Sequence, residues 1–158
     1  MSDIFTKEKR SYIMSKVSRY DTPQEILVRK FLFSKGFRFR KNYRKLPGSP
    51  DIVLPKLKVV IFIHGCFWHG HNCKPARLPK SNTEFWDSKI NSNKERDDRK
   101  SEELRKLGWQ VVLLWQCELS NKKKENNTLK GLLKKLLREC EIKNILHTSS
   151  IQREFVSD

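Results

Sequence analysis

The chain has 158 residues and a formal net charge of +16, because 34 lysines and arginines face 18 aspartates and glutamates. This length suits one compact domain and is too short for two full domains. The longest apolar runs, such as residues 59–63, are far shorter than a membrane span, which excludes an integral membrane protein. No apolar signal segment follows the N-terminus, so we expect a cytoplasmic location. The positive charge favours a polyanionic partner, most often nucleic acid, although a merely basic surface is the alternative.

The first 20 residues are polar and basic with scattered apolar side chains, and they predict an arm or short helix that orders on a partner. A helix is expected next. Thr22 predicts its N-cap, Pro23 lies in its first turn, and Glu25 completes a capping box. Gly36 predicts its end.

The rest of the chain alternates between strand and helix signals, which predicts one α/β domain. Apolar periodicity and turn residues give the boundaries. In chain order we expect strands at 37–40, 51–54 and 59–63, the last of them central and buried, a helix from Asn82 or Thr83 to Leu107 ended by Gly108, a second buried strand at 109–115, a Lys-rich linker at 121–127 and an amphipathic helix at 128–140.

The strand at 59–63, the long helix and the strand at 109–115 form a β-α-β unit. Such a unit makes its two strands parallel, usually as neighbours with a right-handed crossover. The residues that follow each strand therefore emerge at one edge of the sheet, where ligand and catalytic sites collect. Residues 64–73 are rich in His, Cys and Gly, and Cys117 follows the second strand closely. We therefore expect Cys117 to reach this loop.

Four side chains at this edge have the type and number that tetrahedral structural zinc requires, namely Cys66, His71, Cys73 and Cys117. Without a secretory signal, clustered Cys and His favour metal over disulfides. Two alternatives stay open. The fourth ligand can instead be His69 or Cys140, although a cysteine on the last helix is more often a core thiol. Otherwise the loop holds no metal and Cys117 is a buried strand-end residue.

Three further polar side chains are expected nearby. If zinc takes His71, then His64 and His69 remain free, and Asp51 follows a proline at the start of a strand. A carboxylate there can hold Mg²⁺, a hard cation that activates water and neutralises charge on a scissile phosphate. Histidine can act as general base or acid near neutral pH. A turn-capping aspartate and structural histidines are the alternative explanation, but together with the charge the set favours a metal-dependent nuclease.

Phe67 and Trp68 lie in the same loop, which offers little core for two large rings. We expect them to be exposed beside a basic surface, where aromatic side chains wedge between base pairs or stack on bases. The cations of the following helix can meet phosphates, and its amide can read a base edge. A solvated helix face with a tryptophan in the core explains the same spacing equally well. The helix residues that share this face by three- and four-residue steps are Trp86, Lys89, Asn93, Arg96 and Asp97.

At these residues the sequence resembles the very short patch repair (Vsr) DNA mismatch endonucleases. The likeness covers roughly residues 8–140 in order, and the block 66–73 is its most specific part. Its N-terminal portion includes Arg10, Met14 and residues 19–22. The remaining matching segments are 46–51 (LPGSPD), 62–69 (FIHGCFWH), 71–73 (HNC), 83–86 (TEFW), 93–97 (NKERD) and 107–109 (LGW), together with Lys89 and Cys117.

The resemblance implies a restriction-endonuclease-like fold, with a mixed central sheet flanked by helices and a structural zinc site. It implies nicking of DNA on the 5′ side of a thymine mispaired with guanine, a mispair that arises when 5-methylcytosine deaminates. Asp51 and the backbone carbonyl of Ile63 would hold Mg²⁺, for which two ions are expected. His69 would be the general base and His64 would assist at the phosphate.

Further roles follow from the same resemblance. Asp97 would orient His69, as carboxylates often orient histidines. Glu25 would join the network of water and metal, although its capping box already explains it. Phe67, Trp68 and Trp86 would intercalate beside the mismatch from one groove, and Met14 from the opposite one. The DNA contacts would come from Arg19, Lys89 and Asn93, with Arg96 at a phosphate.

We therefore expect a DNA-contacting arm at residues 1–20, one endonuclease domain at 21–140 and a C-terminal tail at 141–158. The expected partner is double-stranded DNA with a T·G mismatch. The protein is expected to be a monomer in the bacterial cytoplasm, associated with the nucleoid. A functional link to a DNA cytosine methyltransferase and to mismatch-repair proteins is also expected.

One departure from the common nuclease pattern concerns the mechanism. Residues 62–64 are Phe-Ile-His where many nucleases carry Glu-x-Lys, so histidine must serve where those enzymes use lysine. Two competing functions stay open. One is a non-catalytic, zinc-stabilised DNA-binding module, and the other is a related nuclease of different specificity, such as a restriction enzyme.

Overall fold

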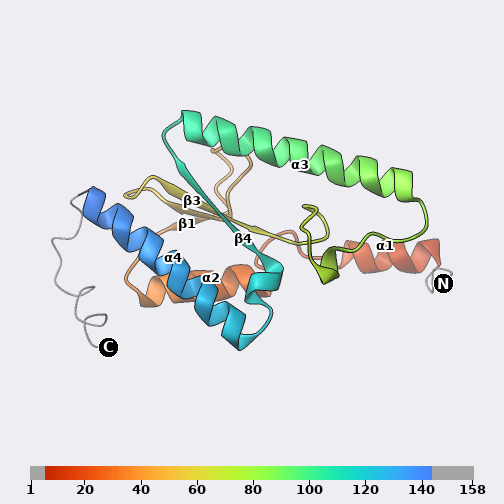
Figure 1. Cartoon of the computed structure of the whole chain (residues 1–158), viewed down its shortest axis with the longest axis horizontal. Helices are drawn as coiled ribbons and strands as arrows, with labels where there is room; N and C mark the ends of the chain where they lie inside the picture. Colours follow the sequence, from red (N-terminus) through yellow and green to blue (C-terminus); the bar gives the residue numbers. More distant parts are fainter. Residues whose placement is uncertain (1–5, 144–158) are drawn as a thin grey trace.

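A four-stranded mixed sheet lies between two layers of helices (Figure 1). The structure is a computed structural model that describes residues 6–143. The strand order is β1-β2-β3-β4, with β1–β2 and β2–β3 antiparallel and β3–β4 parallel. The elements are α1 (Lys7–Ser15), α2 (Pro23–Ser34), β1 (Arg40–Lys41), β2 (Ile52–Leu54), β3 (Val59–His64), η1 (Lys74–Ala76), α3 (Thr83–Lys106), β4 (Gln110–Trp115), η2 (Gln116–Leu119) and α4 (Lys122–Ile142).

Alternate residues of the strands face the two helical layers, because side chains alternate across a sheet. Val59 and Ile61 of β3 belong to the larger core cluster, which includes α2 and α4. Val60 between them packs with Leu104 of α3 in a smaller cluster. All three β3 side chains are fully buried, which confirms the predicted central strand. Figure 1 shows the same arrangement, with α3 on one face of the sheet and α2 and α4 on the other.

The helix α2 ends just before Gly36, as predicted, and the way in which it ends shows that the first predicted strand was misplaced. Gly36 has a left-handed backbone (φ +84°). The N–H of Phe37 donates to the carbonyl of Leu32, which closes the helix in a Schellman motif. Because Phe37 is committed to the helix end and buried in the core, pairing begins only at Arg40. The prediction of a strand over 37–40 was therefore wrong for most of its length.

The predicted β-α-β unit is confirmed by the parallel pairing of β3 with β4. The helix α3 ends at Lys106, two residues before the left-handed Gly108 (φ +83°), and the N–H of Trp109 donates to the carbonyl of Leu104. The strand therefore starts one residue later than predicted. It also lies at an edge of the described sheet, so the prediction of a second buried strand holds for Val112 and Leu114, which are buried in the core, and was wrong for Leu113, which is 41% exposed.

The predicted linker at 121–127 was also wrong, because α4 already begins there. Asn121 caps the helix by accepting a hydrogen bond from the N–H of Lys124 at 3.0 Å. An ion pair of 2.7 Å between Lys122 and Glu125 supports the first turn. Side-chain capping thus outweighs the polar composition that suggested a linker. The helix continues to Ile142, so the predicted tail at 141–158 is helical in its first two residues, and its residues 144–158 lie outside the described part of the chain.

The predicted N-terminal arm contains the helix α1, whose residues 7–15 are described, while residues 1–5 lie outside the described range.

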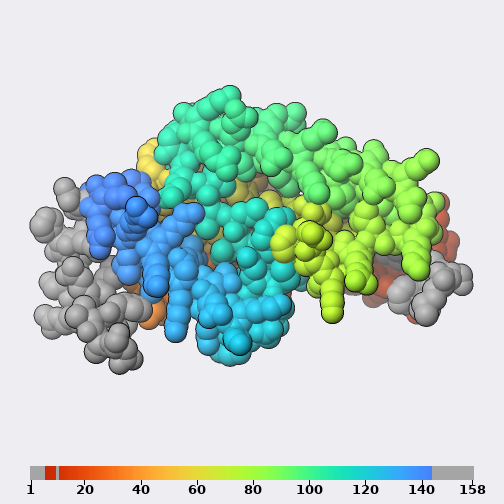
Figure 2. Space-filling view, in the orientation of Figure 1, coloured from red at the N-terminus to blue at the C-terminus, as the bar shows by residue number. Residues whose placement is uncertain are grey.

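The loop between β3 and α3 is exposed on the face of the molecule seen in Figure 2, where it is coloured yellow-green and lies below α3. Within residues 6–143, every helix is too short or too polar to cross a lipid bilayer.

Candidate active site and metal centre

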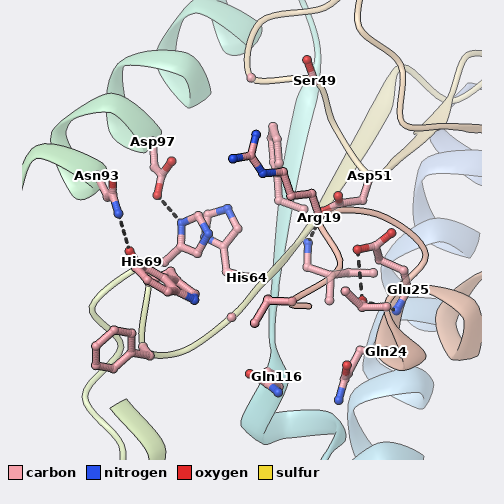
Figure 3. Close-up of a pocket in the computed structure, with 18 of the residues that line it drawn as sticks. Arg19, Gln24, Glu25, Ser49, Asp51, His64, His69, Asn93, Asp97 and Gln116 are labelled. Atoms are coloured by element: carbon pink, nitrogen blue, oxygen red, sulfur yellow. Dashed lines mark hydrogen bonds and ion pairs between the residues drawn. The ribbon is translucent and has the colours of Figure 1, made fainter. Parts of the chain in front are cut away.

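One cavity of about 1060 Å³ brings together the predicted catalytic side chains at the edge of the sheet where β3 ends. Figure 3 shows the two imidazoles and Asp97 on one side, Asp51 and Glu25 on the other, and Arg19 between them. Trp86 is the one predicted catalytic or DNA-contacting residue that does not line the cavity. The predicted residues that line it are Met14, Arg19, Glu25, Asp51, Ile63, His64, Phe67, Trp68, His69, Lys89, Asn93, Arg96 and Asp97.

Asp51 precedes β2 and points toward the neighbouring strand. Its Oδ2 accepts a hydrogen bond of 2.7 Å from the backbone N–H of Ile63. Burial raises the pKa of Asp51 to about 6, and the nearby carboxylate of Glu25 adds to the rise, whereas the hydrogen bond from Ile63 opposes it. Two acidic groups so placed have the hard oxygen atoms that Mg²⁺ prefers, and a bound cation would remove their repulsion.

Glu25 is almost fully buried at the start of α2, with 4% of its surface exposed. The capping role predicted for it is present, because Thr22 Oγ1 accepts from the N–H of Glu25. Its carboxylate accepts from the backbone N–H of Asp21 at 2.9 Å and from the Thr22 hydroxyl at 3.0 Å. A carboxylate has about four lone-pair sites, so these bonds leave capacity toward the cavity. The cap and a role near Asp51 are therefore compatible.

His64 and His69 form a stacked pair, with ring centroids 3.7 Å apart. Nδ1 of His69 lies 2.5 Å from Oδ2 of Asp97, a contact that fixes the ring and directs Nε2 away from Asp97. Burial, and then the neighbouring imidazole of His69, lowers the pKa of His64 to about 4, so this ring is neutral at pH 7. Burial raises the pKa of Asp97, but the hydrogen bond and charge of His69 outweigh it and hold that pKa below its ordinary value.

Three aromatic side chains form an aromatic cluster beside the imidazoles: Phe67, Trp68 and Trp86. All three are half-buried, so none is sealed in the core. The ring of Phe67 meets those of Trp68 and Trp86 edge-on, at centroid distances of 5.1 and 5.3 Å. Trp86 thus contacts the loop although it does not line the cavity. The cluster presents large apolar surfaces next to the candidate catalytic groups.

The predicted DNA-facing side of α3 lies over the loop. Lys89 and Arg96 are exposed and line the cavity. Asn93 is only 7% exposed, because its Nδ2 donates to the carbonyl of Trp68 at 2.9 Å and its Oδ1 accepts from Arg96 at 3.2 Å. In this structure Asn93 therefore fastens the loop to α3, and the reading of a base edge by this amide stays a prediction.

A second group of side chains forms a metal cluster, consisting of Cys66, His71, Cys73 and Cys117. Their ligand atoms all lie within 4.8 Å of one another. Nδ1 of His71 is 3.4 Å from Sγ of Cys117, and tetrahedral zinc with ordinary bond lengths would place such atoms roughly 3.6 Å apart. The donor set and its spacing therefore fit zinc. Burial raises the pKa of Cys66 to about 12, so a metal must displace a proton from that thiol.

The alternatives for the fourth ligand lie elsewhere. His69 belongs to the separate group with His64 and Asp97. Cys140 is a buried core thiol on α4, as the sequence suggested. Cys117 instead follows β4 on η2, and its backbone N–H donates to Sγ of Cys66. The parallel register of β3 and β4 is what brings the two segments together.

Sequence reasoning missed Trp115, the last residue of β4. Its ring stacks on His71 at 4.2 Å and meets His64 edge-on at 5.5 Å. Its pairing with His64 follows from the parallel register, and its position two residues before Cys117 was the available signal. Further polar residues line the cavity to which the sequence analysis assigned no role, namely Ser18, Gln24, Ser49, Lys100, Ser101 and Gln116.

Comparison with known proteins identifies the family. The family described as "DNA mismatch endonuclease Vsr" matches residues 2–75. The type II nicking enzyme V.NmeAIP of Neisseria meningitidis is 56% identical over 122 residues, which cover 77% of this chain and 87% of that protein. The type II nicking enzyme V.XorIIP of Xanthomonas oryzae is 48% identical over 121 residues, covering 77% and 89%. The DNA mismatch endonuclease Vsr of Escherichia coli is 41% identical over 124 residues, covering 78% and 80%.

The family match over residues 2–75 includes Asp51, His64 and His69 and agrees with the resemblance of the motifs. The non-catalytic DNA-binding module is therefore set aside in favour of an enzyme that hydrolyses phosphodiester bonds. The chain belongs to the Vsr family of DNA mismatch endonucleases, and it is a DNA-nicking endonuclease.

Proposed function

We propose that this endonuclease recognises a T·G mispair in double-stranded DNA and, with Mg²⁺, nicks one strand on the 5′ side of the mispaired thymine. The observation that supports this most is the shared cavity, in which Asp51, His64 and His69 lie beside the aromatic cluster. The Escherichia coli relative carries the name of a mismatch endonuclease. Mispairs of this kind arise when 5-methylcytosine deaminates, so the nick would start very short patch repair.

The carboxylate of Asp51 and the backbone carbonyl of Ile63 would hold Mg²⁺, with a second ion near Glu25. When bound, the cation lowers the pKa of water and neutralises charge on the scissile phosphate. His69 would accept the proton of the attacking water at Nε2, because its Nδ1 is committed to Asp97. His64, neutral at pH 7, would hydrogen-bond a phosphate oxygen. Glu25 would orient water beside Asp51.

The aromatic cluster would enter the base stack on one side of the mispair, with Met14 on the other. Unstacking costs less at a mispair than at a paired step, so a wedge of this kind selects mispairs before chemistry. The positively charged cavity residues would hold the backbone on either side. We assign these DNA contacts to Arg19, Lys89 and Arg96, and a base contact to Asn93.

The metal cluster would hold structural zinc and so fasten the loop to the sheet. We further propose a restriction-endonuclease-like fold, with an N-terminal DNA-contacting arm at 1–20, one endonuclease domain at 21–140 and a tail at 141–158. The enzyme would act as a monomer, in the bacterial cytoplasm and on the nucleoid. It would have a functional link to a DNA cytosine methyltransferase and to mismatch-repair proteins.

Strand-labelled duplexes that differ at one position, as T·G, T·A or C·G, test the proposal with and without Mg²⁺. We expect a single nick 5′ to the thymine of the T·G duplex only, and none from Asp51→Asn. A second candidate is a nicking enzyme for a fully paired sequence, since the Neisseria and Xanthomonas relatives are named type II nicking enzymes and their names mention no mismatch. Equal nicking of paired and mispaired duplexes would support that second candidate.

A further inference from the structure

Trp115 lies between the metal cluster and the imidazole pair. Its indole stacks on the ring of His71, with centroids 4.2 Å apart and planes 12° from parallel. Its edge contact with His64 spans 5.5 Å at 77°. His64 in turn stacks on His69 at 3.7 Å, and His69 contacts Asp97. A continuous series of ring contacts therefore joins the metal cluster to the candidate general base.

The sheet, rather than the loop, sets the position of this indole. Trp115 and His64 are partners in register and are the last residues of β4 and β3. Partners in register carry their side chains on the same face of a sheet. The backbone N–H of Trp115 also donates to the carboxylate of Glu118 at 2.9 Å, which ties the strand end to η2. The indole is thus a fixed surface against which His71 packs from an irregular loop.

We propose that Trp115 is a positioning residue that couples the metal cluster to His64 in the nicking reaction. The inference rests on the proposed function, which gives His64 its role at the phosphate. Trp115 does not line the cavity, so it acts through His64 and not on the substrate. Flat rings hold one another's orientation through many weak contacts and through the quadrupole of the aromatic ring. An aliphatic side chain fills the space but removes the aromatic ring that meets His64 edge-on, so the stack on His69 alone holds the plane of His64.

The test compares Trp115→Leu and Trp115→Phe with Trp109→Leu. Trp109 lies just before the same strand, at its opposite end, packs in the smaller core cluster and lies against Lys58, far along the sheet from the imidazoles. For each variant we would measure the zinc content, the rate of zinc release to a chelator, the affinity for the T·G duplex and the single-turnover rate of nicking.

We expect Trp115→Leu to keep its zinc at rest but to release it faster than wild type when challenged. Its affinity for the duplex should stay within about twofold of wild type while its nicking rate falls about tenfold, since only alignment is lost. Trp115→Phe, which keeps a flat ring, should recover the rate to within about threefold. Trp109→Leu should nick at the wild-type rate even if its stability is lower.

A double-mutant cycle separates coupling from a general structural effect. In a His64→Ala background, Trp115→Leu should slow nicking no further, because the group that it positions is gone. Independent effects of the two changes, or a wild-type nicking rate in Trp115→Leu, would overturn the inference. If Trp115→Leu does not fold, the same cycle with Trp115→Phe decides the question. Failure of the wild-type enzyme to nick any T·G duplex would refute the proposed function instead.

Discussion

Replacing Asp51 by asparagine should stabilise the protein while abolishing nicking. Asp51 is a half-buried carboxylate beside a second carboxylate, Glu25, and its pKa is raised from 3.8 to about 6. Asparagine has nearly the same shape and keeps an oxygen that can accept the hydrogen bond from the N–H of Ile63. The variant therefore removes a charge that the folded state disfavours and leaves the local packing in place.

The size of the effect follows from the pKa. A rise of about 2 pH units corresponds to about 3 kcal/mol of lost stability for the ionised form, at about 1.4 kcal/mol for each unit. The pKa of about 6 already includes the opposing effect of the hydrogen bond from Ile63, so that bond needs no separate correction. We therefore expect Asp51→Asn to raise the free energy of unfolding by about 3 kcal/mol at pH 7.5. For a domain of this size that corresponds to a Tm increase of about 6–12 °C.

The pH dependence of stability tests separately whether Asp51→Asn stabilises or destabilises the protein. Below about pH 3, Asp51 is protonated in both the folded and the unfolded chain, so the variant and wild type should be equally stable. As the pH rises from about 3 to about 7 the unfolded chain ionises first, and wild type loses stability relative to the variant. Above about pH 7 both states are ionised, and the difference should stay constant at its full size.

Urea unfolding from pH 4.5 to 7.5 measures the difference, in magnesium-free buffer without chelator so that metal bound at the metal cluster is not removed. Asp98→Asn is the matched control, because Asp98 is an exposed acid on α3 and should change stability little. Adding Mg²⁺ should stabilise wild type but not Asp51→Asn, since a ligand stabilises only the state that binds it. A variant less stable than wild type at pH 7.5 without Mg²⁺ would refute the reasoning.

Four further predictions concern the metal cluster, the loop and the base. Cys117→Ser should lose zinc in a colorimetric release assay, while Cys140→Ala keeps it because that thiol lies in the core; full zinc content in Cys117→Ser would exclude it as a ligand. Gly70→Ala should lower the free energy of unfolding by roughly 1–3 kcal/mol, because Gly70 has φ +63° and an added Cβ would lie 2.6 Å from Cγ2 of Ile90 and closer still to Lys94. Gly131→Ala, in open space on α4, should instead raise it by about 0.5–1 kcal/mol in the same urea titration, and a loss there would contradict the steric argument. Trp68→Ala should reduce the preference for T·G over paired duplex by about tenfold or more in competition binding, and an unchanged preference would remove the wedge from the mechanism. Asp97→Asn should slow nicking by roughly 10–100-fold with unchanged DNA affinity, whereas Asp98→Asn should nick normally; equal rates in the two variants would show that His69 needs no partner.

Much of the fold could be predicted because its signals are local. The caps at Thr22, Gly36 and Gly108 act through hydrogen bonds within a few residues, and the sequence places each of them correctly. The β-branched run of β3 indicates burial, and the β-α-β order requires parallel strands. The errors also have local causes. Asn121 caps a helix inside a segment whose lysines suggested a linker, and Phe37 closes α2 instead of pairing in a strand.

The chemistry of the site depends on contacts between residues far apart in the chain. The sequence supplies the donors for a metal cluster and the imidazoles for a base, but the spacing of residues 64–73 does not decide which histidine serves which group. The sheet register and α3 decide it, by placing His71 against Trp115 and His69 against Asp97.

Residue types, helix ends and the parallel strand pair were thus determined by the sequence itself, since they arise from periodicity and short-range hydrogen bonds. The raised pKa of Asp51, the lowered pKa of His64 and the ring contacts of Trp115 were decided only by the tertiary structure. Desolvation and ring stacking depend on which distant side chains exclude water and at what distance, and no local pattern encodes that.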